Sequence, residues 1–342
     1  MSTNQSGLIH VLSPGLLTTI QDRGRAGWQN HGVSVSGAAD LNSMTIANAL
    51  VGNKLDAPII EFVMVGPDLV FSCDCVVAFS GANFAFSIDG NAIPLGRPIW
   101  IFAGTTVTGN RSSNGAFGYM AISGILDIEA VMGSVSTDTG SKFGGVEGRS
   151  LKAGDVLVVI DSPDKLALLK RMSARGGQSF IAPKWSVKGL FSAKGSKKDK
   201  VLRFVPSEKW IGLSEEVRKT TCLGTYRVTP QSNRMGVRLS GKSIDMQKSE
   251  HEPSVPVVLG AIQVPPNGQP IILSVDRQTI GGYPSIGVVA SVDRTTLVQC
   301  QPGDGLRFVE ISVNDAQTAL LQEQNAMAEL VRSIGHRIQE LS

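Results

Sequence analysis

The chain has 342 residues, of which 38 are glycine, and only 18% of its residues carry a formal charge. Lysine and arginine number 32 against 29 acidic residues, and this balance excludes the basic footprint of a nucleic-acid-binding protein. No apolar run reaches the ~18 residues of a membrane span, and the N-terminus lacks the basic and apolar regions of a secretory signal. We therefore expect a cytoplasmic protein with two domains or one large one.

Short apolar segments alternate with turn residues along most of the chain. They are rich in Val, Ile and Phe, and include residues 76–79, 99–102, 156–160, 271–273 and 287–290. Turn residues return about every ten positions, which is typical of β-barrels and sandwiches. The glycine excess also favours strands, because an interior glycine costs a helix ~1 kcal/mol. We predict a mainly β protein with a few helices.

Two stretches predict helices instead. Apolar residues recur at helical spacing over residues 40–51, and Asp40 is a suitable N-cap for that helix. Residues 314–341 carry a heptad-like apolar repeat and predict a C-terminal helix. This second helix either docks on the protein body or forms the contact with another protein chain, in a homo-oligomer or a heteromer, and both alternatives stay open.

Two features bear on linkers and metal sites. Lysines crowd the segment 183–200 together with Gly and Ser, which predicts a solvated linker or a long loop between two halves. The cysteines form no CxxC pair, and we expect reduced, structural thiols. The histidines form neither HxxxH nor HExxH, so we expect no metal site.

The two halves share short matches in the same order, which indicates an internal repeat. The matched pairs are residues 32–37 with 236–241, 96–99 with 268–271, 118–119 with 282–283, and 153–155 with 302–304. Each half then ends with a Gly-Asp turn and a final strand. We expect a first domain with a helical insertion over 8–182, the linker over 183–200, a second domain over 201–312 and the helix in 313–342.

Residues 236–243 fit the phosphate-loop pattern G-x-x-x-x-G-K-[ST]. That pattern binds phosphate when a glycine-rich loop turns its N–H groups outward at a helix N-terminus. Here Val237 and Leu239 suit a strand, and no helical stripe follows. We therefore expect a strand at this position.

The densest polar cluster is residues 276–284, directly after an apolar strand. Asp276 can act as an acid or a base, and Arg277 can hold a carboxylate or phosphate through two hydrogen bonds. Gly281 and Gly282 let the backbone turn sharply or approach a ligand. We predict a site at a barrel rim; the alternative is an Asp–Arg pair that only fixes a turn.

Two further clusters place polar side chains beside glycines. The candidates in the first are Gln21, Asp22, Arg23 and Ser36, and those in the second are Asn233, Arg234 and Gln263. Ser36 lies just before the helix predicted at residue 40, whose first N–H groups are able to receive an anion. Turn chemistry, N-capping and satisfaction of buried backbone groups are the alternatives without a ligand.

Several of these stretches together resemble the family of allophanate hydrolase subunit 2, also called biotin-dependent carboxyltransferase-like or KipA-like proteins. The signature Asp-Arg-Gln-Thr-x-Gly-Gly-Tyr-Pro occupies residues 276–284, and the signature Thr-x-Gln-Asp-x-Gly-Arg occupies residues 19–25. Further matches extend from about residue 8 to residue 310. The resemblance implies two cyclophilin-like β-barrel domains, which agrees with the internal repeat.

The resemblance also implies the C subunit of an ATP-dependent 5-oxoprolinase, a hydrolase that opens 5-oxoproline to glutamate. Its partners would be a KipI-like subunit 1 protein and a LamB/YcsF-like subunit, and the chain would not act alone. One alternative is the carboxyltransferase half that moves CO₂ from carboxybiotin to urea or a related amide, with biotin on another chain. The other is a non-catalytic regulator that binds a KipI-like kinase inhibitor.

For a 5-oxoprolinase the substrate is a small amide that carries a carboxylate. The expected catalytic residues are Asp276, Arg277 and Tyr283. The expected substrate contacts are Gln278, Thr279, Gly281, Gly282, Gln263, Asn233, Arg234, Gln21, Asp22, Arg23 and Ser36. The site of ATP is not assigned by the sequence.

Overall fold

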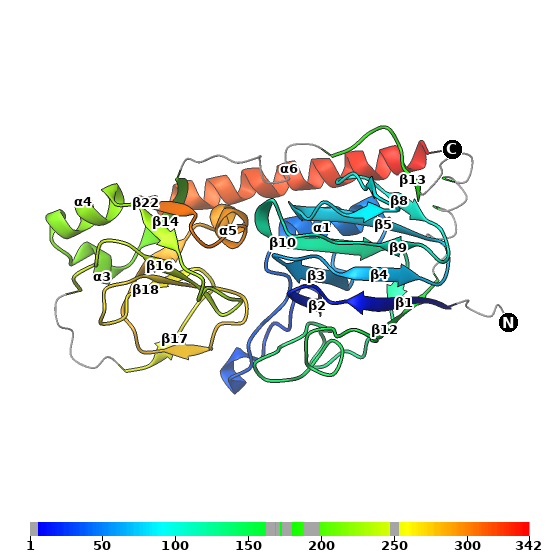
Figure 1. Ribbon diagram of the computed structural model, residues 1–342. Helices are drawn as coiled ribbons and strands as arrows, with labels where there is room; N and C mark the ends of the chain where they lie inside the picture. The colour runs from blue at the N-terminus through cyan, green and yellow to red at the C-terminus, as the bar shows by residue number, and fades with distance from the viewer. Residues whose placement is uncertain are drawn as a thin grey trace. The chain divides into compact units, whose positions relative to one another are not determined.

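The computed structural model describes residues 6–161, 168, 172, 180–187, 199–246 and 253–341. The chain folds into two compact units, which are described separately below (Figure 1). Unit 1 consists of residues 1–24, 40–194 and 327–342, and unit 2 consists of residues 25–39 and 195–326. Among the described residues, strands outnumber helices in both units, which confirms the predicted mainly β class. Most of the lysine-rich segment predicted as a linker lies outside the described residues.

Unit 1 contains two large antiparallel sheets and a small hairpin. The first sheet has the order β11 (Ile125–Leu126), β12 (Val156–Ile160), β1 (Ser6–Ser13), β4 (Asp68–Phe71) and β9 (Thr106–Val107). The second has the order β13 (Phe180–Ile181), β8 (Ile99–Ile101), β5 (Cys75–Asn83), β10 (Asn114–Ile122), β3 (Ile59–Val63) and β2 (Leu17–Gln21). The hairpin joins β6 (Ser87–Ile88) to β7 (Asn91–Ala92). One apolar cluster takes buried side chains from both large sheets, including Ile9, Phe71 and Phe79.

Helix α1 (Leu41–Leu50) packs on β5 and β10 and confirms the first predicted helix. The Asp40 side chain accepts a hydrogen bond from the Ser43 N–H at 3.2 Å, as an N-cap does. The Tyr119 hydroxyl accepts from the Asp40 N–H at 2.7 Å and donates to Glu61 Oε2 at 2.8 Å. Burial raises the pKa of Tyr119 well above its ordinary value, and the negative charge of Glu61 raises it further. The protonated phenol therefore ties the start of α1 to the sheet.

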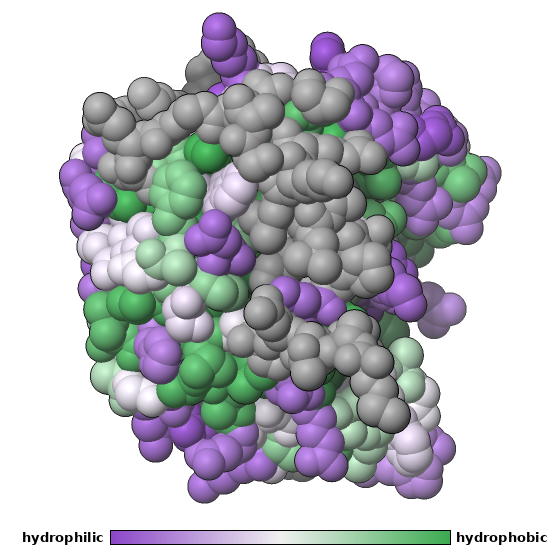
Figure 2. Space-filling model, turned by 90° about the vertical axis from the view of Figure 1, so that its right-hand side faces the viewer, coloured by the Kyte–Doolittle hydropathy of each residue, from purple (hydrophilic) through white to green (hydrophobic). Residues whose placement is uncertain are grey.

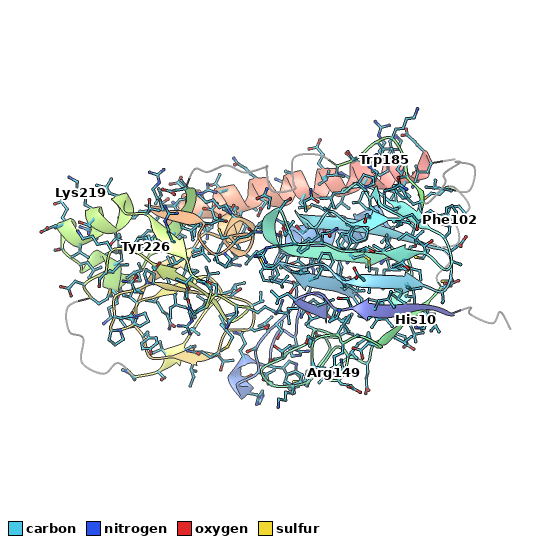
Figure 3. The ribbon with its side chains drawn as sticks, in the orientation of Figure 1. His10, Phe102, Arg149, Trp185, Lys219 and Tyr226 are labelled. Carbon is cyan, nitrogen blue, oxygen red and sulfur yellow. The ribbon has the colours of Figure 1, made fainter. Side chains whose placement is uncertain are left out.

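Unit 2 is organised around a closed seven-stranded barrel. Its strands follow the order β14 (Lys200–Pro206), β21 (Ser285–Val289), β18 (Ala261–Gln263), β19 (Ile271–Leu273), β16 (Gly236–Ser240), β15 (Tyr226–Val228) and β22 (Gly305–Glu310). Outside the barrel lie β17 (Val255–Pro256), β20 (Ile280–Gly281), α3 (Glu208–Ile211), α4 (Glu215–Leu223), α5 (Arg294–Val298) and the short 3₁₀ turns η1 (Gln29–His31) and η2 (Ser291–Asp293). Phe204 and Trp210 fill its core. Tyr226, labelled in Figure 3, belongs to the same core. The phosphate-loop pattern begins in β16, which confirms the predicted strand.

The two Gly-Asp turns have the same geometry, which supports the internal repeat. Gly154 has a φ of 91° and Gly303 a φ of 94°, both in the left-handed region that favours glycine. The Gly154 N–H donates to the Val11 carbonyl at 2.8 Å, and the Gly303 N–H donates to the Val228 carbonyl at 2.8 Å. In each case the carbonyl of the aspartate that follows accepts a bond from the same valine's N–H at 2.9 Å. The same turn therefore precedes β12 in the first half and β22 in the second, whereas the first half continues to a further strand, β13.

Helix α6 (Val313–Gln339) confirms the predicted C-terminal helix. Its two faces differ in burial, since Ile334 is 2% exposed and Leu321 is 61% exposed. The burial of Ile334 arises within the single chain, as a docked helix requires. On the surface drawn in Figure 2, hydrophobic and hydrophilic residues are intermixed. Within the described ranges, no helix combines the length and the apolar character that a membrane crossing needs.

Candidate functional site

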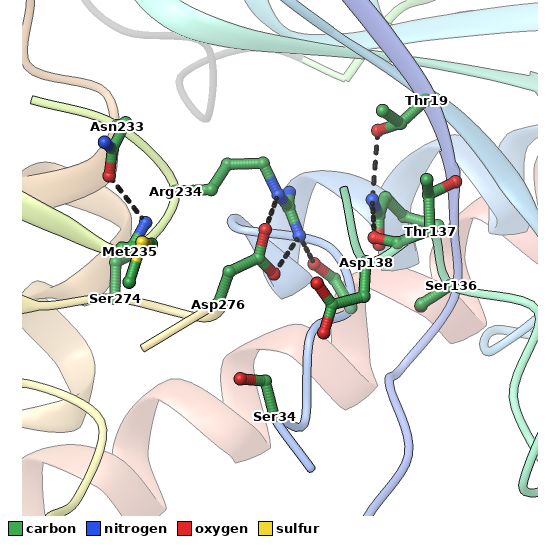
Figure 4. A network of polar contacts seen from close by, with 12 residues as sticks. Thr19, Ser34, Ser136, Thr137, Asp138, Asn233, Arg234, Met235, Ser274 and Asp276 are labelled. Atoms are coloured by element: carbon green, nitrogen blue, oxygen red, sulfur yellow. Dashed lines mark hydrogen bonds and ion pairs between the residues drawn. The ribbon is translucent and has the colours of Figure 1, made fainter. Parts of the chain in front are cut away.

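The centre of the candidate site in unit 2 is a buried ion pair between Arg234 and Asp276 (Figure 4). Arg234 precedes β16 and Asp276 follows β19. Arg234 Nε donates to Asp276 Oδ2 at 2.7 Å, and its Nη2 donates to Asp276 Oδ1 at 3.0 Å. The two side chains are only 5% and 8% exposed. Both carboxylate oxygens are thus engaged, so Asp276 holds the guanidinium in one orientation.

Residues 25–39 belong to unit 2 and are bonded to the segment after β19. Arg234 Nη2 also donates to the Gly37 carbonyl at 2.7 Å. The Ser34 hydroxyl donates to the Arg277 carbonyl at 2.8 Å, and the Ser36 N–H donates to the Val275 carbonyl at 3.2 Å. Ser36 has a φ of 55°, which only a tightly constrained serine adopts. These bonds bring the predicted residues Ser36, Arg234, Asp276 and Arg277 together.

Arg277 is a buried cation without a carboxylate partner among the described residues. It is 7% exposed, its Nη1 donates to the Ser274 carbonyl at 3.3 Å, and its Nε has no hydrogen-bond partner. Burial lowers the pKa of Arg277, and the positive charge of Arg294 lowers it further. Burial also lowers the pKa of Arg294. Two neighbouring guanidinium groups to which the described residues supply no counter-charge favour the binding of an anion.

The other predicted residues of unit 2 divide between the interior and the surface. Gln263 is 2% exposed, and its Nε2 donates to the Tyr283 carbonyl at 3.5 Å. A Cβ atom on Gly281 would lie 2.7 Å from that same nitrogen, so a larger residue there would displace the Gln263 amide. Tyr283 itself is 48% exposed. Gln278, Gly282 and Asn233 are exposed, and Thr279 is half-buried. The Asn233 Oδ1 accepts from the Met235 N–H at 2.8 Å, which closes the turn before β16.

In unit 1, Asp22 fixes a long segment between β11 and β12. Its Oδ1 accepts from the Ser134 and Ser136 hydroxyls at 2.6 Å each and from the Gly24 N–H at 2.7 Å. Its Oδ2 accepts from the Val135 N–H at 2.8 Å. The carboxylate is therefore saturated by the protein, and these contacts favour a loop-fixing role over the predicted substrate contact. The neighbouring Arg23 is exposed.

We predict that Asp22→Ala makes the segment 131–149 sensitive to trypsin. Lys142 in this segment is exposed, and its backbone is held by a hydrogen bond to Asp138. Loss of the Asp22 contacts raises the population of an open loop, and limited proteolysis then cleaves after Lys142 faster than in the wild type. The matched control is Asp127→Ala, since Asp127 is exposed and lies just before the segment. Equal cleavage of wild type and Asp22→Ala contradicts the prediction.

Residues 131–149 were not predicted from the sequence although they contact two predicted residues. The segment supplies Ser134 and Ser136 to Asp22, and the Thr137 carbonyl accepts from Gln21 Nε2 at 3.2 Å. At its end Arg149 forms an ion pair with Asp155 at 2.7 Å (Figure 3). The signal was the run of Gly, Ser and Thr between two apolar strands, which marks a long functional loop.

Residues 31–310 match the family model of the carboxyltransferase domain, subdomain A and B. The chain is 33% identical over 325 residues to the 5-oxoprolinase C subunit of Escherichia coli K12, covering 94% of this chain and 97% of that protein. It is 30% identical over 318 residues to the 5-oxoprolinase C subunit of Haemophilus influenzae, covering 93% of this chain and 95% of that one. With the urea amidolyase of Saccharomyces cerevisiae it shares 31% identity over 329 residues, which cover 91% of this chain and 17% of that much longer protein.

Solved structures agree with these sequence matches. The crystal structure of the Kluyveromyces lactis urea amidolyase is similar with a TM-score of 0.81 and 27% identity, over 97% of this chain and 20% of that one. The Kluyveromyces lactis urea carboxylase is similar with a TM-score of 0.81 and 27% identity, over 97% of this chain and 30% of that one. The family model, the two bacterial relatives and the shared fold show that this chain belongs to the carboxyltransferase domain family, in the group of the 5-oxoprolinase C subunits and the urea amidolyases.

Proposed function

We propose that the protein is the C subunit of an ATP-dependent 5-oxoprolinase that opens 5-oxoproline to glutamate. In this proposal it acts with a KipI-like subunit and a LamB/YcsF-like subunit. Similarity to two proteins named as the C subunit of 5-oxoprolinase, over nearly their whole length, supports it. The observation that carries it is the buried Arg277 beside Arg294, with no carboxylate partner in the described part of the chain. 5-Oxoproline carries a carboxylate that these cations can hold, whereas urea has none.

The residues around the buried ion pair have separate roles in this proposal. Arg277 binds the substrate carboxylate, and Arg294 adds positive potential from a distance. Arg234 presents a fixed guanidinium, because Asp276 and the Gly37 carbonyl hold it in place. Asp276 then acts through Arg234 as a positioning residue rather than as a general base. Tyr283 stays a predicted catalytic residue, supported by its exposed phenol.

The ATP-dependent step falls to the other subunits in this proposal. A phosphate loop is a turn that opens a helix. At residues 236–243 the chain forms strand β16 and then continues without helix through residue 246. The pattern therefore does not fit the phosphates of ATP, and we route no step of nucleotide chemistry through this chain. Its own residues bind and orient the small substrate.

Carboxyl transfer to urea is the second candidate. The similarity to the Kluyveromyces lactis urea carboxylase over 97% of this chain favours it. A biotin carrier on another chain would have to deliver the carboxyl group. Neutral urea does not compensate two buried cations, so in this function the arginines would face the carboxylate of carboxybiotin instead.

Reconstitution separates the candidates. The chain is co-expressed with the subunits encoded beside it, and the purified complex is assayed for ATP-dependent turnover of 5-oxoproline and for carboxylation of urea from carboxybiotin. We expect turnover of 5-oxoproline. Carboxylation of urea alone would establish the second candidate, and tight binding to a KipI-like protein without either turnover would identify a regulator.

A further inference from the structure

Unit 2 brings the side chains of a lysine, a cysteine and an aspartate together outside the candidate site. Lys200 Nζ lies 3.6 Å from Cys300 Sγ and donates to Asp304 Oδ2 at 2.7 Å. Cys300 is a free thiol, and 100 positions separate it from Lys200 in the chain. The fold therefore holds a primary amine and a thiol in contact.

The contact lies where the barrel closes. Lys200 is the first residue of β14, and Asp304 directly precedes β22. These two strands run parallel and side by side, with Lys200 paired to Leu306 (Figure 1). They are the first and the last barrel strands in chain order, and their pairing closes the barrel. The amine and the thiol are thus held together at the junction between the two ends of the barrel sheet.

The sulfur is shielded from most reagents in solution. Cys300 is 7% exposed, and its Sγ donates to the Thr296 carbonyl at 3.1 Å. Burial raises the pKa of Cys300 to about 11, although the positive charge of Lys200 opposes this rise. A buried, protonated thiol reacts slowly with bulky reagents and with the thiols of other molecules. The Lys200 amine has the advantage of proximity, because the fold already positions it against the sulfur.

We propose that Lys200 and Cys300 form an oxidative modification site, in which dioxygen links Nζ to Sγ through one oxygen atom. The ammonium proton first leaves through Asp304, whose side chain is 38% exposed. The neutral amine and the thiol then react with one dioxygen molecule to give an N–O–S bridge and one water. The amine and the thiol each lose one hydrogen, and both hydrogens leave in the water. Nitrogen and sulfur each lose two electrons, and these four electrons reduce the two oxygen atoms.

The geometry favours a bridge through oxygen over a direct N–S bond. The two atoms are separated by 3.6 Å, and an inserted atom reduces the approach that the side chains must make. Asp304 loses the charge of Lys200 but still accepts from the Gln301 N–H at 2.9 Å, so the Gly-Asp turn keeps a bond of its own. The bridge restricts the unfolded chain as a disulfide does, and we expect it to raise the thermal midpoint. The proposal holds whichever reaction the assembled enzyme performs.

Peptide mapping in the presence and absence of oxygen tests this site. The full-length chain is purified under reducing conditions, freed of reductant, and kept either in oxygen-saturated buffer or under nitrogen before digestion with trypsin. In oxygen we expect peptide 199–203, uncut after Lys200, to be linked to peptide 295–307. The mass of the linked pair should equal the sum of both peptides plus one oxygen minus two hydrogens. Dithiothreitol should release both peptides and lower the thermal midpoint to that of the sample kept under nitrogen.

Two variants test whether the bridge depends on this amine. Lys200→Arg keeps a positive charge beside Asp304 but lacks the primary amine, so it should form no bridge and should keep the midpoint of the reduced wild type. Cys222→Ala is the matched control, because it removes a half-buried thiol of α4, and it should keep the bridge. A bridge that persists in Lys200→Arg contradicts the proposal.

The mass of the Cys300 peptide in oxygen decides among the other outcomes. An unmodified peptide, oxygen added to Cys300 alone, or a linked pair that has lost two hydrogens without gaining oxygen would each overturn the proposal. The first would show an inert thiol, the second an ordinary cysteine oxidation, and the third a direct N–S bond. The turnover assay of the complex succeeds or fails independently of this mapping.

Discussion

The Asp276→Asn variant is expected to lose about 3–5 kcal/mol of unfolding free energy and the activity of the reconstituted complex. The change removes the negative charge from a pair whose side chains are 5% and 8% exposed. Arg234 then remains as a buried, uncompensated cation, which is the costly case for an ion pair in the interior. Urea denaturation of the isolated chain measures the first effect, and ATP-dependent turnover of 5-oxoproline measures the second.

Two further variants separate the structural role from the functional one. Asp304→Asn breaks the pair with Lys200, whose side chains are 38% and 24% exposed, so it should cost about 1 kcal/mol or less and keep activity. The double variant Arg234→Met/Asp276→Leu removes both charges and should recover most of the stability without activity. An Asp276→Asn complex that keeps wild-type turnover contradicts the positioning role, and one that keeps full stability contradicts the cost of the unpaired arginine.

Local patterns predicted the elements that local forces determine. Helix α1 followed from apolar spacing and from Asp40, whose side chain indeed caps the Ser43 N–H. Strand β16 followed from alternating apolar residues in spite of a misleading motif. The two Gly-Asp turns followed from the repeat, because a left-handed turn before a strand constrains the residues themselves. The matched pair Tyr119 and Tyr283 shows the limit, since one is 0% and the other 48% exposed.

Contacts between segments far apart in the chain could not be predicted from the sequence. The bond from Ser34 to the Arg277 carbonyl joins residues 243 positions apart, and it places residues 25–39 in unit 2 although the expected boundaries assign them to the first domain. The hydrogen bond from Ser134 to Asp22 spans 112 positions, and no local sequence pattern predicts it. Motifs therefore identified residues such as Arg234 and Asp276, while their pairing and the contribution of residues 131–149 required the fold.

Arg277→Met is expected to abolish binding of the substrate carboxylate while the protein becomes no less stable. Truncating one partner of a buried charge pair costs roughly 2–5 kcal/mol of binding, so kcat/KM for 5-oxoproline should fall at least about 30-fold, mainly through KM. The same variant should weaken substrate binding but should not lower the free energy of unfolding. Burial and Arg294 lower the pKa of Arg277, so folding disfavours its charged form. That cost is fully present at neutral pH and disappears only as the pH rises through the pKa of the folded and then the unfolded state.

Methionine fills a similar volume without the charge, so the thermal midpoint of Arg277→Met should equal or exceed that of the wild type. The matched control Arg307→Met removes an exposed arginine of β22 and should change neither KM nor the midpoint. Arg277→Lys keeps a cation but not the planar pair of donors, and should restore only part of the affinity. Loss of activity together with loss of stability would mean that Arg277 serves the fold. Turnover by Arg277→Met at the wild-type KM would mean that the substrate carboxylate is bound elsewhere, because no binding energy would then depend on this guanidinium.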